Sequence, residues 1–127
     1  MMISIPMVLL IIAIHFFADF VCQSHDMAIN KSKSNYWLTY HVLVYTLVTF
    51  LAWHFCILQP PMEFDVTNLA LFVGLIFSTH WITDYISSRF TSKFFGKGDS
   101  HNGFVVVGLD QVAHYIQLFL AYYLFVK

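Results

Sequence analysis

The sequence predicts an all-α integral membrane protein, an antiparallel four-helix bundle, from three observations. Of the 127 residues, 59% are hydrophobic and 10% are charged, whereas a water-soluble domain carries about 25% charged residues. The apolar residues fall into four runs, each close to the roughly 20 residues of a membrane-spanning helix. The connections are short, so each helix should return alongside the preceding one. We therefore expect residues 1–127 to form a single transmembrane domain.

The four expected spans cover residues 3–24, 38–58, 66–90 and 104–125. Only His15 and Asp19 interrupt the first span before its polar end. Pro60 and Pro61 follow the second span and cannot continue a helix. Residues 96–103, between the third and fourth spans, include three glycines, a composition typical of turns.

The positive charges predict the orientation of these spans. Five of the six Lys and Arg residues belong to the first and third connections or to the helix end beside them: Lys31, Lys33, Arg89, Lys93 and Lys97. Loops rich in Lys and Arg stay in the cytoplasm. The second connection contains Glu63 and Asp65 but no basic residue. Both termini are therefore expected outside. The net charge of -1, without any basic run, argues against nucleic-acid binding.

Ionisable residues occur inside the apolar runs in three pairs with a spacing of four: His15 with Asp19, His80 with Asp84, and Asp110 with His114. Residues four apart share a helix face. The last helix should run opposite to the first and third, and in its pair the aspartate precedes the histidine. All three aspartates are therefore expected at one depth near the cytoplasmic side. The histidines then lie one turn deeper. His41 joins the aspartate layer and Tyr45 lies one turn further in, so all four helices contribute to one cluster.

A weak internal similarity accompanies this pattern. Residues 15–21 and 80–86 match in residue type at five of seven positions, with a spacing of 65. Two related helical hairpins, as in membrane proteins built by duplication, would produce such a match.

The cluster has three interpretations. In the first, its side chains only connect the helices by hydrogen bonds. In the second it binds one or two divalent ions, Zn, Mn or Fe, and hydrolyses a phosphoester or related bond of a lipid or other amphiphilic phosphate. The metal ligands would be His15, Asp19, His80, Asp84, Asp110 and His114. His41 would be a ligand or base, and Tyr45 a proton donor. The third interpretation is a proton or cation pathway, and a non-catalytic membrane adaptor remains a further alternative.

Several other residues can support such a site. Gln23 and Gln111 either orient the ligands or form interhelical hydrogen bonds. Lys31 and Arg89 either hold a lipid phosphate or are solvated charges at the interface. Two groups stay outside the expected core site: the histidines His25, His54 and His101, and the residues Ser87, Ser88 and Gln117, which we assign to packing and hydration.

The motif set resembles a family of small multi-pass membrane proteins of bacteria and phages that is described as a domain of unknown function. The resemblance rests on His15-x-x-x-Asp19-Phe20-x-x-Gln23, on Lys31 and His41, on His80-x-x-x-Asp84 and on Asp110-Gln111-x-x-His114. Together these motifs cover nearly the whole chain. The chain is also distantly similar to inner-membrane proteins described as metal-dependent hydrolases, which share the H-x-x-x-D pattern. The resemblance implies a bacterial inner-membrane location and supports the site residues.

Overall fold

The structure, a computed structural model, describes residues 3–57 and 65–126, and these form helices without a strand. The elements are α1 (Ile5–Phe16), the π-helix η1 (Phe17–Val21), α2 (His25–Asn30), α3 (Asn35–Cys56), α4 (Val66–Gly96) and α5 (Ser100–Phe125). The predicted all-α class is thus confirmed. The expected stop at Pro60 and Pro61, and Glu63 in the same connection, lie outside the described residues.

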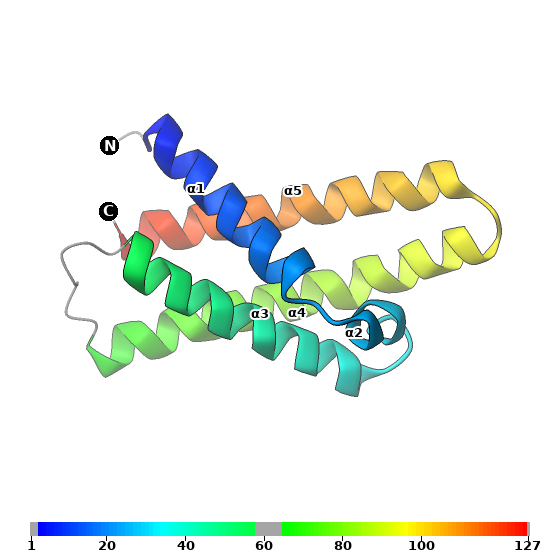
Figure 1. Cartoon of the computed structure of the whole chain (residues 1–127), viewed down its shortest axis with the longest axis horizontal. Coiled ribbons are helices and arrows are strands. Elements are labelled where there is room, and N and C mark those ends of the chain that lie inside the picture. Colours follow the sequence, from blue (N-terminus) through cyan, green and yellow to red (C-terminus); the bar gives the residue numbers. More distant parts are fainter. Residues whose placement is uncertain (1–2, 58–64, 127) are drawn as a thin grey trace.

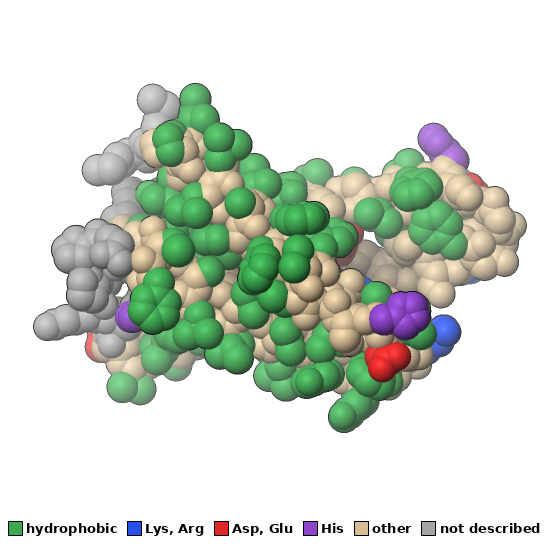
Figure 2. All heavy atoms as spheres, viewed as in Figure 1, with side chains coloured by type: hydrophobic (Ala, Val, Ile, Leu, Met, Phe, Trp, Pro, Cys, Tyr) green, Lys and Arg blue, Asp and Glu red, His purple; other side chains and the backbone are tan. Residues whose placement is uncertain are grey.

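Three helices, α3, α4 and α5, are long and apolar enough to cross a membrane, and Ile5–Val21 is a shorter apolar helix. Their outer faces carry large apolar side chains. Leu9 and Phe16 of α1, Leu47 of α3 and Ile116 of α5 are all more than half exposed. Figure 2 shows hydrophobic side chains spread over the face that contains α1 and α3. Apolar surface of this extent is not left in water. The protein is a membrane protein whose helices contact the lipid bilayer.

α4 and α5 lie side by side as a long hairpin, α3 packs along α4, and α1 crosses this group obliquely (Figure 1). Both termini lie at one end, opposite the turn that joins α4 to α5. An apolar core near the terminal end includes Ile11, Trp53, Phe72 and Leu118, all at most 2% exposed. The Trp53 and Phe72 rings are 5.2 Å apart. The core therefore joins α1, α3, α4 and α5.

The first connection contains more structure than the sequence predicts. The helix changes to π geometry at Phe17, and the Cys22 amide donates to the Phe17 carbonyl five residues earlier. The helix therefore ends at Val21, short of the expected boundary. Ser24 then caps the new helix α2, because its hydroxyl accepts from the Met27 amide at 3.2 Å. Residues 25–30, expected as loop, are helical because this cap and the buried Met27 hold them against α3.

The connection between α4 and α5 is shorter than expected. Residues 96–103 were expected to form a turn, but α4 continues to Gly96 and α5 begins at Ser100. Gly98, at φ 75°, ends α4 in a Schellman motif, in which the Asp99 amide donates to the Phe94 carbonyl at 3.0 Å. Asp99 then caps α5 by accepting from the Asn102 amide at 3.1 Å. With 31 residues, α4 is about 46 Å long and exceeds the thickness of a bilayer core.

Gly103 allows the two helices to approach each other at this end. A β-carbon at Gly103 would lie 2.8 Å from the Phe95 ring. We expect Gly103→Leu to displace that ring and to lower the free energy of unfolding by about 1–3 kcal/mol. Gly108→Leu on the same helix is the matched control, because nothing lies within 4 Å of its β-carbon position. Thermal unfolding in detergent measures both, and equal midpoints for the two variants would contradict the prediction.

Candidate metal centre

The centre of the molecule contains a compact set of buried ligand groups. Asp19 comes from η1, His41 from α3, and His80 and Asp84 from α4, and each is at most 4% exposed. One ligand atom from each residue lies within 4.8 Å of the other three. The four residues form what we call the first ligand group, and they could hold a metal ion.

The distances in the first ligand group match those around a small metal ion. The Nε2 atoms of His41 and His80 are 3.3 Å apart. His41 Nε2 is 3.1 Å from Asp19 Oδ1 and 3.2 Å from Asp84 Oδ2. His80 Nε2 is 3.4 Å from Asp19 Oδ1 and 3.6 Å from Asp84 Oδ1. A tetrahedral zinc site with bonds of about 2.0–2.1 Å has ligand–ligand edges of about 3.3–3.4 Å. An ion would therefore require little rearrangement of these side chains.

A second ligand group consists of Asp19, Asp110 and His114, whose ligand atoms also lie within 4.8 Å of one another. His114 Nε2 is 3.3 Å from Asp110 Oδ1 and 3.1 Å from Asp84 Oδ1. Asp19 therefore belongs to both groups, and Asp84 lies next to both. A shared carboxylate of this kind suits a pair of ions.

Neighbouring polar side chains orient the second ligand group. Ser87 donates a short hydrogen bond to Asp110, and Gln111 Nε2 donates to the other Asp110 oxygen at 3.0 Å. His114 Nδ1 donates to Gln117 Oε1 at 3.3 Å, which leaves its Nε2 free to face the carboxylates. Gln117 is itself fixed by donating to Thr83 Oγ1 at 2.6 Å. The sequence assigned Gln117 to packing, although its position three residues after His114 was the available signal for this contact.

His15, expected as a metal ligand, lies outside both ligand groups. Its Nδ1 is 3.0 Å from the Tyr45 hydroxyl and its Nε2 is 3.0 Å from Gln111 Oε1, while Asp19 Oδ2 is 3.7 Å away. The π turn between the two residues changes the register that an α-helix would give them. Tyr45 also stacks on the His80 ring at 3.8 Å. In this arrangement, His15 packs against the His114 ring and Tyr45 against the His80 ring.

Lys31, which lies outside the long helices, contacts the first ligand group. It follows α2 as its C-cap, and its Nζ lies 2.9 Å from Asp84 Oδ2 and 3.5 Å from His41 Nε2. Burial opposes the charge of this ammonium, but Asp84 and Asp19 outweigh that effect and raise the Lys31 pKa above its ordinary value. Lys31 therefore stays protonated and neutralises part of the carboxylate charge.

The charge balance leaves room for a cation. Three aspartates and one ammonium leave two negative charges when the histidines are neutral. Asp19 Oδ1 and His80 Nδ1 are buried and make no well-aligned hydrogen bond with the described residues. Unpaired carboxylate charge at this depth is costly. A divalent ion would supply the two missing charges and take up the Asp19 oxygen.

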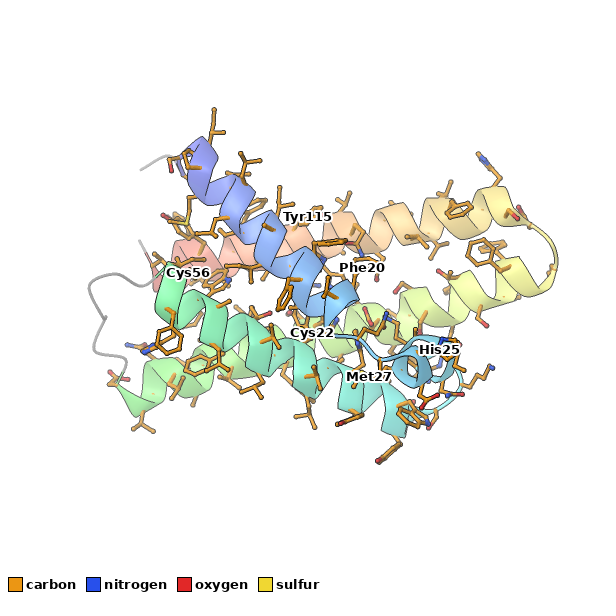
Figure 3. All side chains as sticks on the ribbon, in the orientation of Figure 1. Phe20, Cys22, His25, Met27, Cys56 and Tyr115 are labelled. Carbon is orange, nitrogen blue, oxygen red and sulfur yellow. The ribbon has the colours of Figure 1, made fainter. Side chains whose placement is uncertain are left out.

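Other residues considered in the sequence lie elsewhere. Arg89 donates to Asn35 Oδ1 at 2.7 Å and covers the Tyr85 ring, so the structure does not bring it into the site. The histidines His25, His54 and His101 belong to neither ligand group. Figure 3 shows His25 on α2 at the surface and Tyr115 on α5, where α1 crosses it. The Tyr115 ring packs edge-on against His15 at 5.3 Å.

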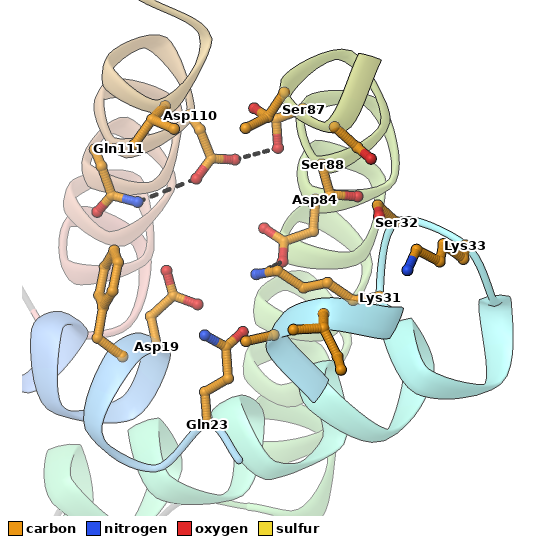
Figure 4. Close-up of a pocket in the computed structure, with 16 residues that line it drawn as sticks. Asp19, Gln23, Lys31, Ser32, Lys33, Asp84, Ser87, Ser88, Asp110 and Gln111 are labelled. Atoms are coloured by element: carbon orange, nitrogen blue, oxygen red, sulfur yellow. Dashed lines mark hydrogen bonds and ion pairs between the residues drawn. The ribbon is translucent and has the colours of Figure 1, made fainter. Parts of the chain in front are cut away.

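A cavity of about 490 Å³ opens directly beside the carboxylates. Asp19, Asp84 and Asp110 line it together with Gln23 (Figure 4), whose buried Oε1 has no hydrogen-bond partner among the described residues. Residues of η1, of α2 with the following turn, of α4 and of α5 surround it. The candidate ligands are thus buried in the bundle but accessible from one side.

No curated protein and no solved structure matches the chain. One family model, described as "Protein of unknown function (DUF3307)", matches residues 7–127 and so includes every residue of both ligand groups. The chain belongs to the DUF3307 family.

Proposed function

We propose that this protein is a metal-dependent membrane hydrolase that cleaves a phosphoester or related bond of an amphiphilic substrate. One or two divalent ions, Zn, Mn or Fe, would be held by the two ligand groups. The observation that carries the proposal is the cavity, because it is lined by Asp19, Asp84 and Asp110, the carboxylates of those groups. A substrate in the cavity would reach the ions without any opening of the bundle.

The residues around the cavity suit metal-dependent hydrolysis. Bound divalent ions supply an activated water and stabilise the negative charge that develops on phosphate oxygens. Asp19 would help to hold an ion in either ligand group, and Gln117 would keep His114 Nε2 directed toward the carboxylates. Lys31 would neutralise an anionic group close to Asp84. Water is the natural attacking group, since the sequence contains no classical nucleophile motif.

A proton or cation pathway is the alternative use of the same residues. It would need a polar route to the terminal end of the bundle. The buried hydroxyls of Thr46 and Thr49 continue beyond Tyr45, but Trp53, Phe72 and Leu118 close the core behind them. The packing of the described residues therefore favours a site with one opening. Proton flux in liposomes that survives removal of all metal would instead support the pathway.

Metal analysis and a hydrolysis assay test the proposal. The protein, purified without chelators and analysed by inductively coupled plasma mass spectrometry, should contain one or two transition-metal ions per chain. It should also release phosphate from an alkyl phosphate such as dodecyl phosphate, and lose that activity when EDTA removes the metal. His54→Ala, outside both groups, should retain both properties. Absence of metal in the native and the reconstituted protein would refute the hydrolase.

We further propose that the chain is one transmembrane domain with four antiparallel spans in a bacterial inner membrane. α1 with η1 would be the first span, and both termini would lie outside. The positions of the termini at one end of the molecule, opposite the basic turn after α4, support this topology.

Native and introduced cysteines test this topology. Cys22 directly follows η1, and Cys56 is the last residue of α3. The two lie toward opposite ends of the bundle (Figure 3), and Cys56 is exposed. In a Cys22→Ala background, a membrane-impermeant maleimide should label Cys56 from outside intact spheroplasts. In a variant without native cysteines, Lys97→Cys should react only after the membrane is opened. The reverse pattern would invert the topology.

A further inference from the structure

We infer that the cavity binds the phosphate headgroup of a membrane lipid, which enters sideways from the bilayer between η1 and α5, with Lys31 as its anchor. This inference rests on the proposed function and names its substrate class. It depends on the polar and apolar side chains that line the cavity, on the position of its mouth along α5 and on the contacts of Lys31.

One wall of the cavity is rich in hydroxyl groups. Five of them line it: Ser32 after α2, and Ser87, Ser88, Thr91 and Ser92 on α4. The Ser88 hydroxyl is buried and has no partner among the described residues, although it lines the cavity. Lys31 and Lys33 lie on the same side. Hydroxyls and ammonium groups are the donors that phosphate oxygens accept from.

Apolar side chains from η1, α2 and α5 also line the cavity. Phe20 of η1, Ile29 of α2 and Val107 of α5 line it, and Phe20 and Ile29 are 44% and 45% exposed. Phe20 lies on the outer side of η1 in Figure 3. Among the described helices, α5 packs chiefly against α4. The hollow in the molecular surface next to the α4–α5 hairpin is visible in Figure 2.

The mouth lies within the apolar band of α5. On one side of Val107 along the helix, Phe104 and Val105 are 67% and 46% exposed, and on the other side Leu109 and Val112 are 64% and 54% exposed. Apolar side chains exposed over this length face lipid and not water. A ligand that enters beside Val107 therefore comes from the bilayer, and an alkyl chain can remain there while the headgroup enters the cavity.

Lys31 connects the headgroup with the metal centre. In the structure its ammonium is bound to Asp84 Oδ2 and is also near His41 Nε2, both in the first ligand group. An ion bound there would take the place of the ammonium next to Asp84. Lys31 would then lose its carboxylate partner while still lining the cavity, where a phosphate can replace Asp84.

Binding of matched phosphates tests the inference. We would use zinc-loaded protein in nanodiscs of a zwitterionic phospholipid, with empty nanodiscs as background, and compare radiolabelled dodecyl phosphate with glycerol 3-phosphate. Dodecyl phosphate should bind at least tenfold more tightly. Val107→Trp should weaken its binding at least tenfold without loss of zinc, whereas Val105→Trp, which does not line the cavity, should not. Ile29→Trp is a second variant at the mouth, in case Val107→Trp does not fold.

The outcomes separate this inference from the proposed function. Equal affinity for the two phosphates, or full binding by both mouth variants, would overturn lipid entry and indicate a soluble phosphate ester, while retained zinc would leave the metal centre standing. Preferential binding of dodecyl phosphate by protein that never retains metal would support the lipid site and refute the hydrolase. Lys31→Met should reduce dodecyl phosphate binding at least tenfold, and unchanged binding would remove Lys31 as the anchor.

Discussion

Replacing Asp19 by Asn is expected to remove metal from both positions of the centre at once. Asp19 is the only residue common to the two ligand groups among the described residues. An amide keeps the size of the side chain but lacks the negative charge that a divalent ion requires. We expect affinity to fall by more than about 100-fold, since even residues that only orient a ligand contribute about 10–100-fold. Metal analysis after dialysis should find fewer than one ion in ten chains.

Matched substitutions distinguish the metal bound by the first ligand group from that bound by the second. His80→Ala should remove only the ion of the first ligand group, and Asp110→Asn only that of the second, so each should retain half of the metal if two ions bind. Gln111→Ala removes a hydrogen bond to Asp110 but no ligand, so it should lower the metal affinity by at most about 10–100-fold, less than Asp19→Asn. Retention of full metal by Asp19→Asn would show that the groups do not share this carboxylate.

The sequence was sufficient to predict that the helices are apolar and that the ionisable residues converge. Both results depend on simple periodicities, because an apolar run defines a helix and a spacing of four defines a face. His80 with Asp84 and Asp110 with His114 follow this rule on regular α-helices. His41 had no partner at that spacing, yet its depth in the second apolar run was enough to place it in the cluster.

The parts of the site that the sequence could not predict depend on departures from that regularity. The π turn at residues 17–21 directs Asp19 into both ligand groups while His15 binds Tyr45 and Gln111, and no residue type in that segment signals such a turn. The helix α2 could not be predicted either, because six residues are too few to show the helical periodicity of apolar side chains. The position of Lys31 against Asp84 depends on α2, so a residue that looked like a topology signal belongs to the site.

Lys31→Met should make the stability of the protein strongly dependent on metal. Without an ion, the substitution leaves the buried Asp84 carboxylate without its cationic partner at 2.9 Å. Losing one member of such a pair costs on the order of 3 kcal/mol, which corresponds to a fall in melting temperature of roughly 10 °C for a domain of this size. With an ion bound, the ion supplies the missing positive charge and the penalty disappears. Thermal unfolding with EDTA and with zinc measures both states.

The same substitution should strengthen metal binding, which distinguishes an ammonium that competes with the ion from one that only supports the fold. Removing a positive charge next to Asp84 and His41 should tighten zinc binding by about tenfold, equal to about 1.4 kcal/mol. Lys31→Arg keeps the charge and should behave like the native protein. Lys33→Met alters a neighbouring lysine for which no ion pair is found among the described residues, and should change neither quantity. Weaker zinc binding by Lys31→Met would mean that the ammonium holds the ligands in place. It would refute the hypothesis that a metal ion displaces Lys31 from Asp84.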